Sequence, residues 1–217
     1  MSKSIPFLAI ALPLLAAAGV NGVVVHGHGG CPHGAVPSMT AQRACSAVCG
    51  TRHMRRLCLS TLLPHGHGQS AAPVTRYAAA AARAAMDAYA AAKHAMFRHG
   101  RAALPAAERK AYAGCVRGYE SSRLSMGRLA GDLAALEIME MGNSSCEDAR
   151  KKEGEVRQDY RGGLRGMDAC WRSVMKLGIE MGNAYSYPAA ASEVWERNLG
   201  DRNRTLLAAL LCSLLVA

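Results

Sequence analysis

The clearest pattern of apolar positions in the chain lies between residues 112 and 136. Apolar and small side chains recur there at alternating steps of three and four residues, which is the spacing of one face of an α-helix. The positions are Tyr112, Cys115, Tyr119, Ser122, Met126, Leu129, Leu133 and Leu136. A second stripe follows at Val156, Tyr160, Leu164, Met167, Cys170 or Trp171, and Val174. The two stripes predict two long amphipathic helices.

The other segments also favour helix. Residues 41–63 have short-range helical character, and residues 74–98 are rich in alanine with almost no helix breakers. Residues 64–73 form a Gly/His-rich loop, and residues 178–200 have no regular pattern. Long helices joined by short breaks predict an all-α fold built as an antiparallel bundle.

The C-terminal segment, residues 206–217, is apolar on every side. This composition favours a buried last helix over the alternative, a lipid-anchor signal that is removed on maturation. Cys212 lies within the segment and is therefore expected to be a buried free thiol.

Two cysteines test the predicted hairpin of the second and third long helices. If the turn lies near Gly142-Asn143, residues equidistant from it lie side by side, and Cys115 and Cys170 meet this condition. They could then reach the ~5.5 Å Cα separation of a disulfide. Cys146 cannot pair with Cys115 in this arrangement, because about 26 helical residues, or roughly 39 Å, separate Cys115 from the turn.

The N-terminus resembles a secretory signal peptide, expected over residues 1–24. Lys3 precedes an apolar run from Ile5 to Val20 that ends on small residues. The run is short for the alternative, a membrane anchor, which needs about 20 apolar residues. We expect cleavage between Ala18 and His26, a flexible Gly/His-rich lead-in over residues 25–40, a helical domain over 41–217, and no membrane association after cleavage.

Secretion changes the interpretation of the cysteines. All eight follow the expected cleavage site, and an even number in an oxidising compartment indicates disulfides before metal or thiol chemistry. They are Cys31, Cys45, Cys49, Cys58, Cys115, Cys146, Cys170 and Cys212. Two sequons, at Asn143 and Asn203, predict N-glycosylation on the same route.

Composition and charge narrow the class of partner. Ala, Leu and Met dominate the apolar residues and aromatics are only 5%, which favours helix. The formal net charge is +10, but the basic residues are spread along the chain without interleaved aromatics. Nucleic-acid binding is therefore not expected. The positive net charge is compatible with an acidic protein or an acidic polysaccharide as the partner. It is equally compatible with a charged surface that only keeps the protein soluble.

Metal binding and catalysis are the rival functions. Imidazole and thiolate side chains are suitable zinc or copper ligands. They cluster at His26, His28, Cys31 and His33, and again at His65 and His67. Their spacing matches no defined zinc module, so a flexible linker is the favoured interpretation. The chain has no Gly-x-Ser-x-Gly, Walker or His-Glu-x-x-His motif. We therefore expect no enzyme activity, cofactor or resident metal.

Several local motifs occur in an ordered combination from Cys45 to Ala217. They are Cys49-Gly-Thr-Arg52 leading to Leu57-Cys58-Leu-Ser-Thr-Leu62, then Cys115-Val-Arg-Gly-Tyr119-Glu-Ser followed by Leu124, then Gly142-Asn143 with Ala149, Tyr160, Leu164 and Cys170, and last the apolar Leu206 to Leu215. This combination resembles the plant invertase and pectin methylesterase inhibitor family. The resemblance implies an N-terminal helical hairpin with a Cys49–Cys58 disulfide, followed by an up-down-up-down four-helix bundle with a Cys115–Cys170 disulfide.

The function that the resemblance implies is inhibition of a cell-wall enzyme. Members of the family block the active-site cleft of pectin methylesterase or acid invertase by stoichiometric protein–protein contact, without a cofactor. The expected location is therefore extracellular, in the apoplast and cell wall. Nothing in the sequence indicates an oligomeric state.

The chain departs from the family's pattern at several points. Thr51 follows Cys49 by two residues instead of three, the proline common between the first cysteines is absent, and Cys170 follows Cys115 by 55 residues. The Pro-Lys-Phe motif associated with invertase inhibitors does not occur. Pectin methylesterase is therefore the favoured target. The alternatives are an inhibitor of acid invertase, a diverged member without a retained target, and a non-inhibitory His/Cys metal-binding secreted protein.

Overall fold

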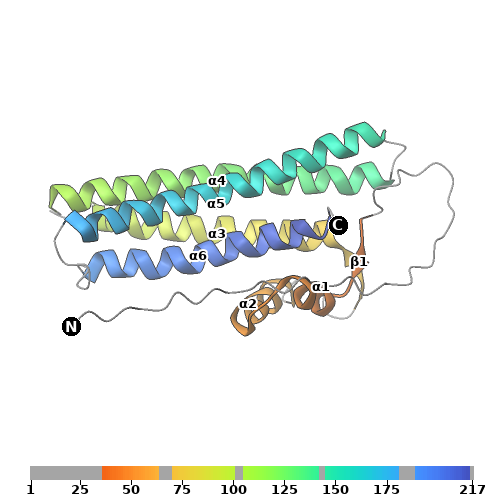
Figure 1. Cartoon of the computed structure of the whole chain (residues 1–217), viewed down its shortest axis with the longest axis horizontal. Helices are drawn as coiled ribbons and strands as arrows, with labels where there is room; N and C mark the ends of the chain where they lie inside the picture. The colour runs from red at the N-terminus through yellow and green to blue at the C-terminus, as the bar shows by residue number, and fades with distance from the viewer. Residues whose placement is uncertain (1–35, 64–69, 101–104, 142–144, 181–188, 216–217) are drawn as a thin grey trace, which may run out of the picture. The chain divides into compact units, whose positions relative to one another are not determined.

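The structure is a computed structural model that describes residues 36–63, 70–100, 105–141, 145–180 and 189–215. The described part is all-α apart from two strands of two residues each (Figure 1). The elements are β1 Ser38–Met39, α1 Ala41–Val48, α2 Arg52–Leu62, β2 Ala72–Pro73, α3 Val74–Gly100, α4 Ala106–Met141, α5 Cys146–Glu180 and α6 Ala189–Ser213.

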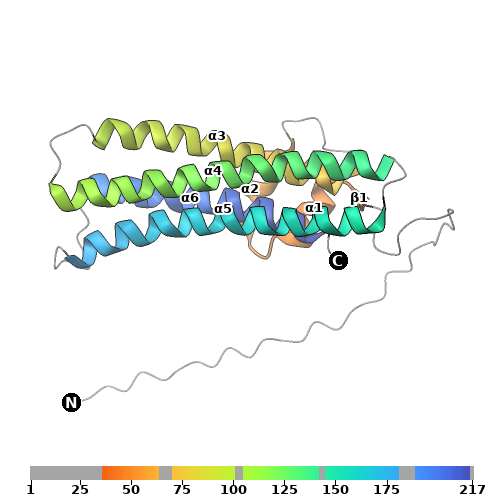
Figure 2. The same ribbon diagram turned by 90° about the horizontal axis from the view of Figure 1, so that it is seen from above.

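The four helices α3–α6 run alongside one another, as both views show (Figures 1 and 2). α4 packs against α5 and α3, and α6 packs against α3 and α5. Their shared core contains the largest fully buried side chains. These include Tyr77, Tyr89, Met96, Tyr119, Met126, Leu129, Leu133, Met167, Leu207 and Leu211.

The apolar stripes predict the buried faces of the central helices, except that Tyr160 and Leu164 of the second stripe are only partly buried. All eight positions of the first stripe are buried in α4, and none is more than 5% exposed. In the second stripe the core-facing residue is Cys170, whereas Trp171 is 39% exposed and packs against Trp195 with ring centroids 5.7 Å apart. The helix expected over residues 74–98 is also confirmed, as α3.

The prediction of irregular structure over residues 178–200 is wrong for 178–180 and 189–200, while residues 181–188 lie outside the described residues. α5 continues to Glu180, and α6 begins at Ala189 instead of residue 206. The buried face of α6 begins with Val194 and continues with Asn198, Asp201 and Thr205, each at most 4% exposed. Three polar residues at helical spacing on the inner face conceal the apolar periodicity from a hydropathy analysis.

The short helices α1 and α2 form a hairpin that packs against α3 and α6. Each begins at a threonine cap: Thr40 Oγ1 accepts a hydrogen bond from Arg43 N at 3.3 Å, and Thr51 Oγ1 accepts one from Met54 N at 3.2 Å. Such caps satisfy backbone N–H groups that the helix itself leaves unpaired. Helical structure over residues 41–63 is therefore confirmed, with a break at Cys49–Thr51.

Strands β1 and β2 connect the N-terminal segment to the start of α3. Ser38 pairs with Pro73 in antiparallel register, and Tyr77 donates a hydrogen bond to Met39 O at 2.8 Å. The expected flexible lead-in over 25–40 and the expected loop over 64–73 therefore both end in structured residues. Strands of two residues are too short to produce a period in the sequence.

The first predicted disulfide needs correction. Cys58 is bonded to Cys45, with a Cα separation of 5.7 Å, and Cys49 is a free cysteine. Cys45 and Cys58 are fully buried on the inner faces of α1 and α2, whereas Cys49 caps the end of α1 in an extended conformation. Cys49 therefore lies where the chain leaves the helix, away from the inner face of the hairpin.

The second disulfide joins Cys115 to Cys170, the pair that the hairpin geometry predicts. Cys146, at the first position of α5, is also disulfide-bonded. Cys212 is a buried free thiol, as expected. Residues 1–24, most of the lead-in, Asn143 and both His clusters lie outside the described residues. No helix in the described part of the chain combines the length and the apolarity needed to span a bilayer.

Candidate docking groove

α4 and α5 approach each other through glycine and serine. A Cβ atom added to Gly118 would lie 2.5 Å from Gly166 O, and one added to Gly166 would lie 2.5 Å from Gly118 O. Ser122 Oγ donates a hydrogen bond to Gly163 O at 2.7 Å. The two backbones therefore pack closer than larger side chains would permit, and the absence of those side chains leaves a trough above the contact.

This trough is a groove of about 500 Å³ along the junction of α4 and α5. Its lining consists of Gly114, Arg117, Gly118, Ser121, Ser125, Arg128, Gln158, Gly162, Arg165, Gly166, Ala169 and Ser173. A second hollow of about 120 Å³ shares Gly114, Arg117 and Ser173 with it and extends to Lys110 and Lys176. The two hollows together are called the seam groove below.

Within the described residues, the seam groove is lined by basic residues and by no acidic residue. Arg117 and Arg165 are exposed, and neither forms an ion pair with another residue of the described ranges. Arg128 follows Arg117 by eleven residues on the same helix, which corresponds to roughly 16 Å. Acidic and basic residues are nearly balanced over α4 and α5 as a whole. The positive charge of the groove is therefore a local arrangement.

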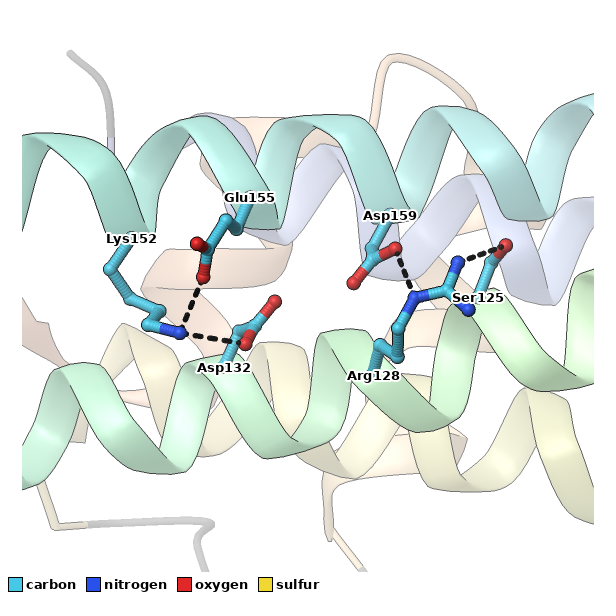
Figure 3. A network of polar contacts seen from close by, with 6 residues as sticks. All are labelled: Ser125, Arg128, Asp132, Lys152, Glu155 and Asp159. Carbon is cyan, nitrogen blue, oxygen red and sulfur yellow. Dashed lines mark hydrogen bonds and ion pairs between the residues drawn. The ribbon is translucent and has the colours of Figure 1, made fainter.

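Arg128 is held at one end of the groove by a buried carboxylate (Figure 3). Its Nε donates to Asp159 Oδ1 at 2.9 Å, and its Nη2 donates to Ser125 Oγ at 3.3 Å. Burial raises the pKa of Asp159, and the Arg128 guanidinium opposes this by stabilising the charged form. Arg128 therefore has a fixed orientation, although most of its side chain is in contact with solvent.

The basic lining ends beyond Arg128, where acidic residues enter the α4–α5 junction. Lys152 Nζ donates to Asp132 Oδ1 at 3.1 Å and also to Glu155 (Figure 3). These hydrogen bonds raise the pKa of Lys152, and the bond that Lys152 donates to Glu155 has the largest effect. The positive charge of Lys152 is neutralised by the carboxylates of Asp132 and Glu155. This part of the junction is therefore less suited to binding an external anion than the seam groove is.

The side chains that line the seam groove are chemically suited to binding anions. Guanidinium groups form paired, charge-assisted hydrogen bonds with carboxylates, sulfates and phosphates. Neither Cys49 nor Cys212, the free thiols of the described residues, is activated. Burial raises the pKa of Cys49, although Arg55 opposes it, and burial raises the pKa of Cys212 to about 12. A protonated thiol is a weak nucleophile. Within the described ranges, no three His, Cys, Asp or Glu residues are grouped as they would be around a metal ion.

Two predicted modification sites have different outcomes. Asn143 and the predicted metal ligands (His26, His28, Cys31, His33, His65 and His67) lie outside the described residues, so they stay predictions. Asn203 lies half-buried within α6, and Thr205 of its sequon is fully buried. The Asn203 acceptor is therefore on a helix instead of a surface loop.

Beneath the groove side of α4, a polar network lies inside the core. Tyr119 donates to Asp201 Oδ2 at 2.9 Å, and Arg204 Nη1 donates to Asp201 Oδ1 at 2.8 Å. Thr205 donates to the Asp201 carbonyl at 2.8 Å and is hydrogen-bonded to Tyr89. Burial raises the pKa of Asp201, whereas the hydrogen bond from Tyr119 lowers it. This network links α3, α4 and α6 without any side chain reaching the groove lining.

We expect the stability difference between the wild type and an Asp201→Asn variant to depend on pH. Because the pKa of Asp201 is raised in the folded state, the folded chain binds this proton more readily than the unfolded chain does. The wild type therefore gains stability relative to the variant as the pH falls through the folded-state pKa. The gain is complete below the unfolded value of about 4. Urea unfolding of both proteins at pH 7, 5.5 and 4 measures it, and a constant difference would contradict it.

The seam groove cannot be recognised from the pattern of apolar residues, although the spacing of glycines in the sequence indicates it. Glycines recur four residues apart on both helices, at Gly114 and Gly118 and at Gly162 and Gly166. In isolation each glycine only lowers helix stability. Their role becomes visible once the Cys115–Cys170 hairpin places Gly118 against Gly166, Gly114 against Ser173 and Gly162 against Ser125.

No protein-family model, curated protein or solved structure matches this chain.

Proposed function

We propose that the chain is a secreted inhibitor of a cell-wall carbohydrate-active enzyme, with pectin methylesterase as the favoured target, and that it acts by stoichiometric docking. In this proposal α3–α6 are an up-down-up-down four-helix bundle, and α1–α2 are the hairpin that precedes it. Two disulfides join helices within these units. A scaffold ordered in advance loses little conformational entropy when it binds a partner.

The observation that carries the proposal is the charge of the seam groove. Arg117 and Arg165 present guanidinium groups over a glycine floor that lets a partner's backbone come close, and no carboxylate from the described part of the chain lines the groove. An acidic loop of an enzyme would supply the missing carboxylates.

The Cys45–Cys58 disulfide removes one of the features on which the family resemblance is based. The bonded residues Cys45 and Cys58 are 13 positions apart, so the spacing of nine between Cys49 and Cys58 is not that of a disulfide. The support that stays is the order of parts: a hairpin of two short helices with one disulfide, then long helices with a second disulfide between α4 and α5.

An inhibition assay tests the proposal directly. Oxidised protein is titrated into several pectin methylesterases and acid invertases at pH 5–6, with the residual activity of each enzyme as the readout. We expect stoichiometric loss of pectin methylesterase activity. Inhibition of invertase alone would transfer the proposal to that target, and no inhibition of any isoform would refute it.

Two charge-reversal variants locate the docking surface. We expect Arg117→Glu combined with Arg165→Glu to weaken inhibition at least tenfold, because the change places carboxylates opposite those of the partner. The control is Arg123→Glu combined with Arg161→Glu, which makes the same charge change at exposed positions of the same helices outside the groove. Equal loss of inhibition in both variants would contradict docking at the seam groove.

A further inference from the structure

The positive charge of the chain is concentrated in its N-terminal part. No Asp or Glu occurs before Asp87, and neither α1 nor α2 contains an acidic residue. The hairpin carries four arginines, namely Arg43, Arg52, Arg55 and Arg56, and all of them are exposed. None forms an ion pair with another residue in the described ranges.

This arrangement is unfavourable for the stability of the hairpin itself. Arg52 is the first residue of α2 and Arg55 lies in its first turn, where the helix dipole disfavours positive charge. Arg52 also lies three and four residues before Arg55 and Arg56, and like charges at these spacings repel each other. Sequences depart from these preferences for the placement of charge on a helix chiefly where a function requires the charged residues.

The hairpin nevertheless holds its arginines in fixed relative positions. The Cys45–Cys58 disulfide joins its two helices, and Thr40 and Thr51 cap their first turns. Met54, Cys58 and Leu62 form the buried face of α2, so the arginines all lie on the solvent side.

We propose that this arginine hairpin is a second binding surface, for a linear acidic polysaccharide, separate from the seam groove. Successive uronate or sulfate groups of such a polymer would meet guanidinium groups repeated along α2, each through charge-assisted hydrogen bonds. The inference does not depend on inhibition of any enzyme.

Other polyanionic partners fit the hairpin less well. It contains no Phe, Tyr or Trp, on which nucleic-acid bases would stack. The apolar face of α2 is buried in the core, so it cannot insert into a lipid surface. The exposed positions of α1 and α2 are polar or small, whereas protein interfaces are centred on large apolar or aromatic side chains.

Affinity electrophoresis and calorimetry with the oxidised full chain test this inference, using polygalacturonate and dextran sulfate as probes and neutral dextran as the blank. We expect salt-sensitive binding to the acidic polymers. The variant Arg52→Gln, Arg55→Gln, Arg56→Gln should bind at least tenfold more weakly. The matched control, Arg123→Gln, Arg157→Gln, Arg161→Gln, removes three exposed arginines of α4 and α5 and should change binding less than threefold. Preference for one polymer identifies the anionic group.

Each other outcome overturns the inference. Equal loss of polysaccharide binding in the two triple variants would mean that only the net charge of the protein matters. Unchanged polysaccharide binding in the hairpin variant would mean that the hairpin is not the binding site. Tighter binding to single-stranded DNA, a polyglutamate peptide or phosphatidylserine vesicles would assign the hairpin to another partner. The hairpin variant should retain enzyme inhibition, and the Arg117→Glu, Arg165→Glu variant should retain polysaccharide binding, so the two proposals fail separately.

Discussion

Replacing Cys115 and Cys170 together by alanine should lower the free energy of unfolding by about 2–4 kcal/mol. The two residues are 55 positions apart, so their disulfide closes a long loop and restricts the unfolded chain. Both are fully buried between α4 and α5, directly beside the close contact of Gly118 with Gly166. Urea unfolding and the melting temperature measure the loss, and either single alanine variant should show a comparable decrease.

A third cysteine is the control for this experiment. Cys49 is half-buried and free, so Cys49→Ser should change the free energy of unfolding by less than about 0.5 kcal/mol. If the serine variant were destabilised as much as the double alanine variant, Cys49 would be a bonded residue and the Cys45–Cys58 pairing would be wrong. An unchanged melting temperature in the double alanine variant would refute the Cys115–Cys170 disulfide.

The parts of the fold that sequence predicted are those set by local periodicity. The stripe on α4 has an apolar or small residue at every inward position, so its face is visible without any partner. The Cys115–Cys170 pair follows from the same periodicity, because two straight helices with a known turn place equidistant residues side by side. Predicting such a pair requires only the lengths of the two helices and the position of the turn between them.

The parts that sequence missed depend on tertiary partners. Asp201 and Thr205 are buried beside Tyr119 of α4 and Tyr89 of α3, which hydrogen-bond to them, and Asn198 donates to Met167 O of α5. Nothing local in α6 reveals these partners on other helices. The choice between Cys45 and Cys49 as the partner of Cys58 depends on which side of α1 faces α2. A spacing shared with a family cannot decide it.

The two candidate surfaces differ in how far their charge can be recognised from the sequence. Along the sequence the Lys and Arg residues are spread without a dense block, so no binding site was predicted from them. The absence of acidic residues before Asp87 is nevertheless visible in the sequence, and it accounts for the charge of the α1–α2 hairpin. The seam groove depends on folding, because Arg117 and Arg165 come together only when α4 packs against α5, whereas Asp132 and Glu155 pair with Lys152 farther along the junction.

Replacing Gly118 by alanine should lower the free energy of unfolding by about 1–3 kcal/mol, although alanine favours a helix. The added Cβ would lie 2.5 Å from Gly166 O and 3.0 Å from Cys170 N, and both are backbone atoms that cannot rotate away. α4 and α5 must then separate, which also distorts the floor of the seam groove. Denaturant unfolding measures the first effect, and weaker inhibition in the enzyme assay measures the second.

The matched control makes the sign of this effect decisive. Gly131 lies on the same helix, and a Cβ added there meets no atom within 4 Å. Gly131→Ala should therefore raise the free energy of unfolding by up to about 1 kcal/mol, through helix propensity alone. Opposite signs in the two variants would establish that Gly118 is present for close packing. If both alanine variants were stabilised, α4 and α5 would not meet through their backbones at this point, and the glycine floor on which the docking proposal depends would be lost.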